Sequence, residues 1–250
     1  MKNSNVTTIA QGPYFERLAK QEIPLNMKAD LWVKAAEEYK KIDDVASVAR
    51  AYFSAANATL LLARQFREPN NSRFYLKAGQ LFLQAKSYPA AELAFTEGAS
   101  TTSDPQSKSF FYIETGLSAT RQHDYLKAAK SFHLAGITSN NERHLNHAAL
   151  YFIMSGNSNM SIDVYHELYF LTNNPQYLRY VGNCFNTFRQ DPELADYYYT
   201  LADLCTISRQ NLSTIFPHGV TLFSATPSQT IMVDTPRVTP TTNSPRSLSN

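Results

Sequence analysis

The stretch YLKAGQLF, from Tyr75 to Phe82, decides the fold of this chain. An aromatic residue opens it, the small pair Ala78–Gly79 follows one helical turn later, and Phe82 stands seven residues after Tyr75. Residues at these spacings share one face of an α-helix. Small and aromatic residues continue at fixed distances, at Ala91, Phe95 and Gly98. The stretch therefore predicts one helix followed by a second that packs against it.

The same pattern occurs in five copies. They begin at Trp32, Tyr75, Tyr112, Leu145 and Leu178. We assign one extra residue to the first and the last copy, just before the second helix, which places its pattern at Ala49, Phe53 and Ala56 in the first copy and at Ala195, Tyr199 and Ala202 in the last. A unit of this length cannot bury its own apolar face, so the copies must stack on one another.

The residue types explain the spacing. The small pair lets the second helix of a copy approach the first, and the aromatic residues fill the space between neighbouring copies. Trp32 is a packing residue in this scheme. Asp43 and Asp44 are expected to cap the second helix of the first copy.

This arrangement resembles the tetratricopeptide superfamily over about residues 28–210. The resemblance implies an all-α, right-handed solenoid of about five helix-turn-helix repeats that binds proteins. Two branches of the superfamily are similar in detail. The block AGQLFLQA, Ala78–Ala85, resembles soluble NSF-attachment proteins, while Trp32–Ala56 and Lys77–Leu83 resemble the huntingtin-associated protein family. The segment DDVASVARAYFSAANAT lacks the cysteine that the second of these families carries there.

Composition divides the chain into three predicted regions. Residues 1–23 are expected to be a flexible N-terminal segment, and 24–210 a helical repeat domain. Residues 211–250 are a Thr/Pro-rich and mostly disordered tail, because such a segment buries too little apolar surface to offset its ordering entropy. Residues 211–224 keep enough apolar side chains to dock elsewhere. Four Ser/Thr-Pro steps make the tail a candidate for phosphorylation, or it is simply passive; the sites are Thr226, Thr235, Thr239 and Ser244.

Charge and cysteine content limit the possible functions. The formal net charge is +2, from 23 basic and 21 acidic residues, and no basic run appears, which argues against nucleic acid as a partner. The two cysteines, Cys184 and Cys205, fit reduced core residues. The start of the chain has no apolar signal region, and we expect no integral membrane segment.

We find no residue pattern that would support catalysis. Phosphate-binding, dinucleotide-binding and nucleophile-elbow motifs are missing from the sequence. His144 and His147 lie one helical turn apart, but no third metal ligand is evident, so a solvated helix face is the simpler interpretation. The sequence therefore predicts no enzyme, no cofactor and no metal.

The first helix of each repeat lines the concave surface in this superfamily, which predicts a groove. Its middle is apolar and its C-terminal end is polar and mildly basic. The candidate groove residues are Leu76, Leu83, Ile113, Leu117, Leu150, Ile153, Arg143, Arg179 and Asn183. The alternative is that the apolar ones pack within the stack or lie beneath residues 211–224.

We therefore expect a non-catalytic adaptor, a subunit that docks on a larger partner protein such as another helical-repeat protein. The alternative is a vesicle-trafficking factor of the attachment-protein type that acts on coiled-coil assemblies. Either function predicts a cytoplasmic protein, and the second a location at the periphery of endosomes or vesicles.

Overall fold

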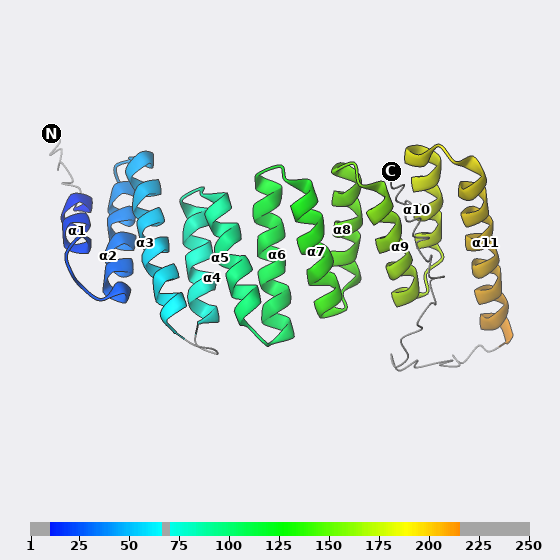
Figure 1. The fold of residues 1–250 in the computed structure, drawn as a ribbon, viewed down its shortest axis with the longest axis horizontal. Coiled ribbons are helices and arrows are strands. Elements are labelled where there is room, and N and C mark those ends of the chain that lie inside the picture. The colour runs from blue at the N-terminus through cyan, green and yellow to red at the C-terminus, as the bar shows by residue number, and fades with distance from the viewer. Residues whose placement is uncertain (1–10, 67–70, 216–250) are drawn as a thin grey trace, which may run out of the picture. The chain divides into compact units, whose positions relative to one another are not determined.

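The structure is a computed structural model that describes residues 11–66 and 71–215, with side chains as far as Ser208. It divides into two units, Met1–Ser208 and Arg209–Asn250, and the fold below is that of the first. Within the described ranges every regular element is a helix, and from α1 to α10 each helix packs on the next one in the chain (Figure 1).

The helices alternate between two roles, which we name A and B. The A helices are α2 (Leu25–Lys40), α4 (Ser72–Gln84), α6 (Pro105–Arg121), α8 (Glu142–Met154) and α10 (Gln176–Cys184). The B helices are α3 (Val45–Gln65), α5 (Tyr88–Thr101), α7 (Tyr125–Ser139), α9 (Ser158–Thr172) and α11 (Pro192–Ile215). These five pairs confirm the predicted all-α solenoid of tetratricopeptide-like repeats.

The turn from A to B is built in the same way in successive repeats. One residue adopts the left-handed conformation, such as Lys86 with φ 57° or His123 with φ 59°. The next N–H then bonds back to a carbonyl of the A helix, as from Ser87 to Phe82 at 2.9 Å. This is the Schellman arrangement, which satisfies carbonyls that would otherwise be orphaned at the helix end.

The first repeat corrects one detail of the predicted register. Its left-handed residue, Asp43 (φ 54°), stands as far after Trp32 as Lys86 does after Tyr75, so this repeat has no extra residue. Tyr52 is buried in place of Phe53, which is 41% exposed. Relative to the first residue of the repeat pattern, α2 ends one residue earlier than α4, and the loop after it is one residue longer. Helix α3 therefore begins at the same distance from Trp32 as α5 does from Tyr75.

The exposed Phe53 still contacts the next repeat, since its ring packs edge-on against that of Phe82 with 5.4 Å between the ring centroids. The capping prediction holds for one of the two aspartates. Asp44 accepts a hydrogen bond from the Ser47 N–H at 3.0 Å, whereas Asp43 supplies the left-handed turn.

The last repeat does contain the extra residue, but inside a helix rather than in the turn. Residues Phe185–Arg189 form a π-helical segment, η1, directly after α10. The hydrogen bond that closes this turn runs from the Asp191 N–H to the Phe185 carbonyl at 3.1 Å. Its donor and acceptor residues are one position further apart in the sequence than those of the equivalent bond from Ser87 to Phe82. A π-helical turn absorbs an insertion without shifting the B helix. Ala195 and Ala202 accordingly keep their predicted buried positions.

Glycines on the A helices permit the close approach that the sequence predicts. A Cβ placed on Gly79 would have three ring atoms of Phe95 within 2.6 Å. A Cβ placed on Gly116 would lie 2.9 Å from the Phe132 ring, and one on Gly182 2.7 Å from Tyr199. Each aromatic ring therefore covers its glycine, as the repeat scheme requires.

Both ends of the predicted repeat domain extend further than expected. Helix α1 (Gly12–Ala19) lies within the segment predicted to be flexible and packs on α2. The Tyr39 hydroxyl donates a 2.7 Å hydrogen bond to the Glu16 carboxylate of α1, and the repeat pattern does not predict this contact. At the other end α11 continues past residue 210 to Ile215.

Among residues 11–66 and 71–215, one helix is apolar and long enough to cross a membrane. It is α3, with a mean hydropathy of 1.2 in its most apolar window. Its core positions, among them Ala51, Ala55 and Ala63, are fully buried between its neighbours, which is the pattern of a core helix of a repeat.

Candidate partner-binding face

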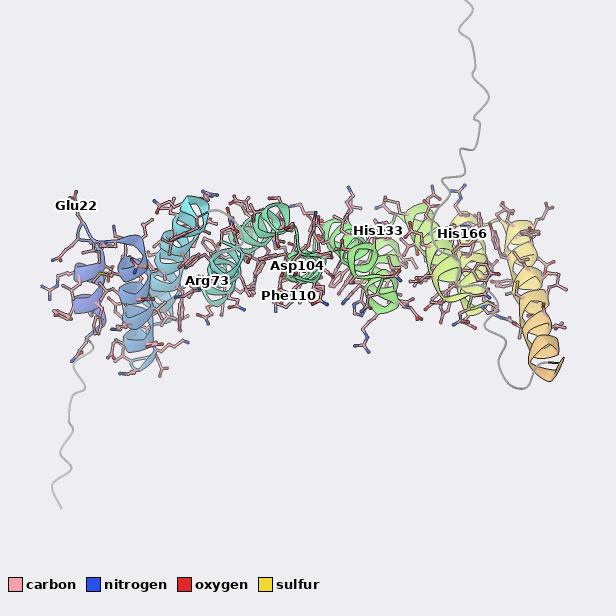
Figure 2. All side chains as sticks on the ribbon, turned by 90° about the horizontal axis from the view of Figure 1, so that it is seen from below. Glu22, Arg73, Asp104, Phe110, His133 and His166 are labelled. Carbon is pink, nitrogen blue, oxygen red and sulfur yellow. The ribbon has the colours of Figure 1, made fainter. Side chains whose placement is uncertain are left out.

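Three hollows lie on the face of the A helices, each between two successive A helices. The first lies between α2 and α4, and the second lies between α4 and α6 and is lined by Leu76, Arg73 and Phe110. Figure 2 labels Arg73 on α4 and Phe110 on α6. The third lies between α8 and α10. Residues of the A helices thus make up most of the lining of these three hollows.

The third hollow is the best candidate for a binding site and has a volume of about 570 Å³. Helix α8 contributes Leu150 and Ile153 to one wall. Tyr165 of α9, Tyr177 and Tyr180 of α10, and Phe188 of η1 supply the aromatic part of the lining. We call this hollow the tyrosine pocket; its residues are Asn146, Leu150, Ile153, Tyr165, Asn174, Gln176, Tyr177, Tyr180, Asn183, Cys184, Thr187 and Phe188.

None of the residues that line the tyrosine pocket carries a formal charge at neutral pH. Four of them are carboxamides, namely Asn146, Asn174, Gln176 and Asn183. A carboxamide offers both a donor and an acceptor, which is the complement of a peptide backbone unit. The pocket therefore combines an aromatic surface with neutral hydrogen-bonding groups.

Three tyrosines pack together in the pocket wall. The ring of Tyr165 lies 6.3 Å from that of Tyr177 and 5.3 Å from that of Tyr180. Burial raises the pKa of the Tyr165 phenol to about 12. Burial, followed by the hydrogen bond to Glu142, raises the pKa of the Tyr177 phenol to about 12. Both phenols consequently stay neutral at physiological pH.

A polar bridge holds α8 and α10 at the spacing that leaves the pocket open. The Tyr177 hydroxyl donates to the Glu142 carboxylate and accepts a 2.8 Å hydrogen bond from the Asn146 amide. Tyr177 itself is 4% exposed, so this bridge lies in a poorly solvated setting. Because hydrogen bonds to charged groups are the stronger ones, the bridge is well suited to fix the distance between the two helices.

The π-helical segment completes the pocket. The one-residue insertion keeps Phe188 within the helical segment, at the position where α4, α6 and α8 have already reached their C-cap residue. Phe188 is 49% exposed and presents part of its ring to the hollow. Sequence reasoning found the insertion but placed it in the turn, so it missed this wall.

The predicted groove residues divide into two groups. Leu150, Ile153 and Asn183 line the tyrosine pocket, and Leu76 lines the hollow between α4 and α6. The remaining apolar ones, Leu83, Ile113 and Leu117, are half-buried and pack against the buried core of the stack, on which Leu76 and Ile153 also pack. Among the apolar groove residues, Leu150 is the most open, at 52% exposure.

The two arginines do not form the shared basic end that was predicted. Arg143 is exposed and lines a separate hollow at the start of α8, beside Glu142. Arg179 pairs instead with Asp203 of α11. It misses the groove because its side chain reaches the B helix of its own repeat, and its charge is compensated there.

His144, His147 and Cys184 pack against neighbouring side chains. His144 and His147 both lie against the Phe132 ring, at 6.5 and 5.4 Å between centroids. Over the described part of the chain, no three His, Cys, Asp or Glu side chains come together as a metal site would require. Cys184 is buried, and burial raises the pKa of its thiol, which leaves it protonated and unreactive.

Comparisons with known proteins identify structural neighbours only. No family model and no curated protein matches the sequence. Among solved structures, a crystal structure of MamA is 14% identical with a TM-score of 0.39, covering 70% of this chain and 96% of MamA. A second MamA structure is 13% identical with a TM-score of 0.39, covering 78% of this chain and 98% of MamA.

Proposed function

We propose that this protein is a non-catalytic adaptor whose A-helix face binds an extended or helical segment of a partner protein. The tyrosine pocket takes an uncharged apolar or aromatic side chain of that segment. The observation that carries the proposal is a pocket of about 570 Å³ that is lined by aromatic rings and carboxamides and has no formal charge. Apolar anchors in desolvated pockets dominate the energetics of protein recognition.

The chemistry of the pocket supports binding over catalysis. The ionisable groups in its lining are three tyrosines and Cys184. Burial raises the pKa values of Tyr165, Tyr177 and Cys184, so these groups hold their protons at neutral pH and provide neither a general base nor a nucleophile. The carboxamides supply neutral donors and acceptors that suit a peptide backbone, although Asn146 Nδ2, Asn174 Oδ1 and Asn183 Oδ1 each already have one partner within the chain.

A peptide display screen with the full chain tests the proposal. We expect the enriched peptides to carry one bulky apolar or aromatic residue and little net charge around it. The variant Leu150→Asp with Phe188→Ser should lose these peptides, because both side chains line the pocket and are about half exposed. Met154→Asp is the matched control, since Met154 is 56% exposed on the same helix and outside the pocket lining.

Two results would overturn the proposal. One is a set of enriched peptides that bind the pocket variant and the wild-type chain equally well. The other is enrichment of strongly charged peptides, which an uncharged pocket cannot favour. Circular dichroism of each variant shows that the helices persist.

Deleting Thr187 tests the contribution of the π-helical segment. The deletion removes the inserted residue, so the end of α10 can continue as an ordinary α-helix into a turn like those of the other repeats. We expect the fold to persist and the pocket peptides to bind at least about tenfold more weakly. Undiminished affinity would show that the wall made by η1 is dispensable.

A further inference from the structure

The outward face of α11 is apolar where the other B helices are wholly or partly polar. The core residues of α7 and α11 are equivalent by repeat position, which aligns their outward positions as well. In α11 these positions follow a 3–4–3 spacing; Tyr197 and Leu204 lie opposite the buried residues Ala195 and Ala202, and Leu194 and Leu201 lie on the side of the helix next to these alanines. We call them the α11 stripe: Leu194, Tyr197, Leu201 and Leu204.

The exposure of the α11 stripe is high for apolar side chains. Leu194 is 40% exposed, Tyr197 58% and Leu204 59%, while Leu201 is half-buried. Phe170 of α9, at the repeat position equivalent to Leu204, is 80% exposed and extends the apolar surface onto the neighbouring helix. An exposed apolar surface of this extent marks a place where another element packs.

The same four positions differ in the other B helices. In α7 two of them are Lys127 and Lys130, and in α9 two are Asp163 and Glu167. In α3 all four are polar: Ser47, Arg50, Ser54 and Asn57. Among the B helices that the structure describes, α11 alone has four apolar residues there, so the repeat pattern itself does not account for the stripe.

The surroundings of the stripe are acidic. Helix α9 and residues 190–208 contain no lysine or arginine, and the preceding Arg189 donates a hydrogen bond to the Asn159 carboxamide at the start of α9. Asp163, Glu193 and Asp196 are exposed beside the stripe. Glu167 faces His133 at 2.7 Å, and Asp203 pairs with Arg179 across the helix pair. This surface therefore has a negative potential that selects a positively charged occupant.

From these observations we infer that the α11 stripe docks an amphipathic helix of a partner protein whose apolar face is flanked by lysine and arginine. The 3–4–3 spacing is that of a helix–helix seam. A second copy of this chain would bring the same acidic residues into contact, which costs energy through like-charge repulsion. An anionic membrane surface is repelled for the same reason. This surface is separate from the tyrosine pocket and does not depend on the function proposed for it.

Synthetic helical peptides test the inference. The basic probe is a peptide of about 18 residues, roughly the length of the stripe and its flanks, with leucines at 3–4 spacing and lysines beside them. The acidic probe replaces the lysines by glutamates, and a scrambled basic probe keeps the composition. Fluorescence anisotropy with the full chain should show the basic probe binding at least about tenfold more tightly than the other two.

The double variant Tyr197→Ser with Leu204→Ser should weaken the basic probe by about tenfold or more. Leu93→Ser is the matched control, because Leu93 occupies on α5 the position that Tyr197 occupies on α11 and is 51% exposed. Hydrogen exchange should show protection of α11 by the basic probe. Equal binding of the basic and acidic probes, or full binding by the double variant, overturns the inference.

Other occupants give distinct results in the free, full-length chain. If sedimentation shows a dimer that the double variant dissociates, a second copy occupies the stripe. If the double variant speeds hydrogen exchange in residues 216–250, the chain's own tail occupies it. If vesicles containing phosphatidylserine bind the wild-type chain and not the double variant, the face is a membrane surface. Each of these outcomes would overturn the proposal that the helix of a partner protein occupies the α11 stripe.

Discussion

Gly79 and Gly116 hold the same position in successive repeats, yet alanine should affect them differently. A new Cβ at Gly79 would meet three ring atoms of Phe95 within 2.6 Å, whereas at Gly116 the three nearest atoms of Phe132 lie at 2.9, 3.0 and 3.3 Å. Both glycines lie inside helices, where alanine by itself stabilises by about 1 kcal/mol. Overpacking of a tight core costs about 1–3 kcal/mol.

These terms set the expected free energies of unfolding. For Gly79→Ala the clash exceeds the gain in helix propensity, and we expect a net loss of about 1 kcal/mol, up to about 2 kcal/mol. For Gly116→Ala the small shift required of Phe132 roughly cancels the gain, and we expect a change within about 0.5 kcal/mol. A leucine side chain at position 116 is too large for a small shift of Phe132 to accommodate, so Gly116→Leu should lower the free energy of unfolding by about 1–3 kcal/mol.

Urea unfolding followed by circular dichroism measures these changes. The second substitution Phe95→Leu frees space beside residue 79, so it should make Gly79→Ala less costly than it is in the wild-type background. The reasoning is refuted if Gly79→Ala is as stable as Gly116→Ala, or if Phe95→Leu leaves the cost of Gly79→Ala unchanged. An unchanged melting temperature for Gly116→Leu would refute the repeat register itself.

High pH should destabilise the last repeats, because the pKa values of Tyr165 and Tyr177 are about 12 in the folded chain against 10.0 for an exposed phenol. The unfolded chain then releases these protons first, so stability is present below pH 10 and is lost as the pH rises towards 12; Tyr165→Phe should flatten that loss in alkaline melts, and an unaltered slope would contradict the assignment. Low pH should act through His144, whose pKa burial lowers from 6.5, so stability is lost as the pH falls through that folded pKa. His144→Phe should reduce the acid sensitivity measured by thermal melts, and an identical profile would count against it. The predicted phosphorylation sites, Thr226, Thr235, Thr239 and Ser244, lie outside the described residues and stay a prediction. Phosphopeptide mapping of residues 225–250 tests it, and full coverage without any phosphate would exclude phosphorylation of this segment.

The order of helices and most of the core can be derived from the sequence alone. Spacings of three, four and seven residues identify one face of a helix, and the recurrence of that face at intervals of 43, 37, 33 and 33 residues identifies the stack. Gly79 opposite Phe95 follows directly, since both positions lie within one repeat. These are local relations, so the sequence expresses them fully.

The candidate site could be predicted only in part from the repeat pattern. The positions of Leu150, Ile153 and Asn183 on the A-helix face follow from the repeat, and the structure places all three in one pocket. The burial of Ile113 and Leu117 does not follow, because the repeat position alone does not say how far a side chain sinks between its neighbours.

Tertiary packing decided the rest. The pairing of Arg179 with Asp203 joins residues 24 apart, and it depends on how α10 and α11 face each other. The inserted residue could enter either the turn or the helix, and the buried alanines of α11 require the second choice because a π-helical turn leaves the B helix in register. Helix α1 forms outside any repeat because α2 offers it a surface and Glu16 a hydroxyl partner. A periodic sequence determines what each helix presents, but contacts between helices determine which of those side chains remain available for a partner.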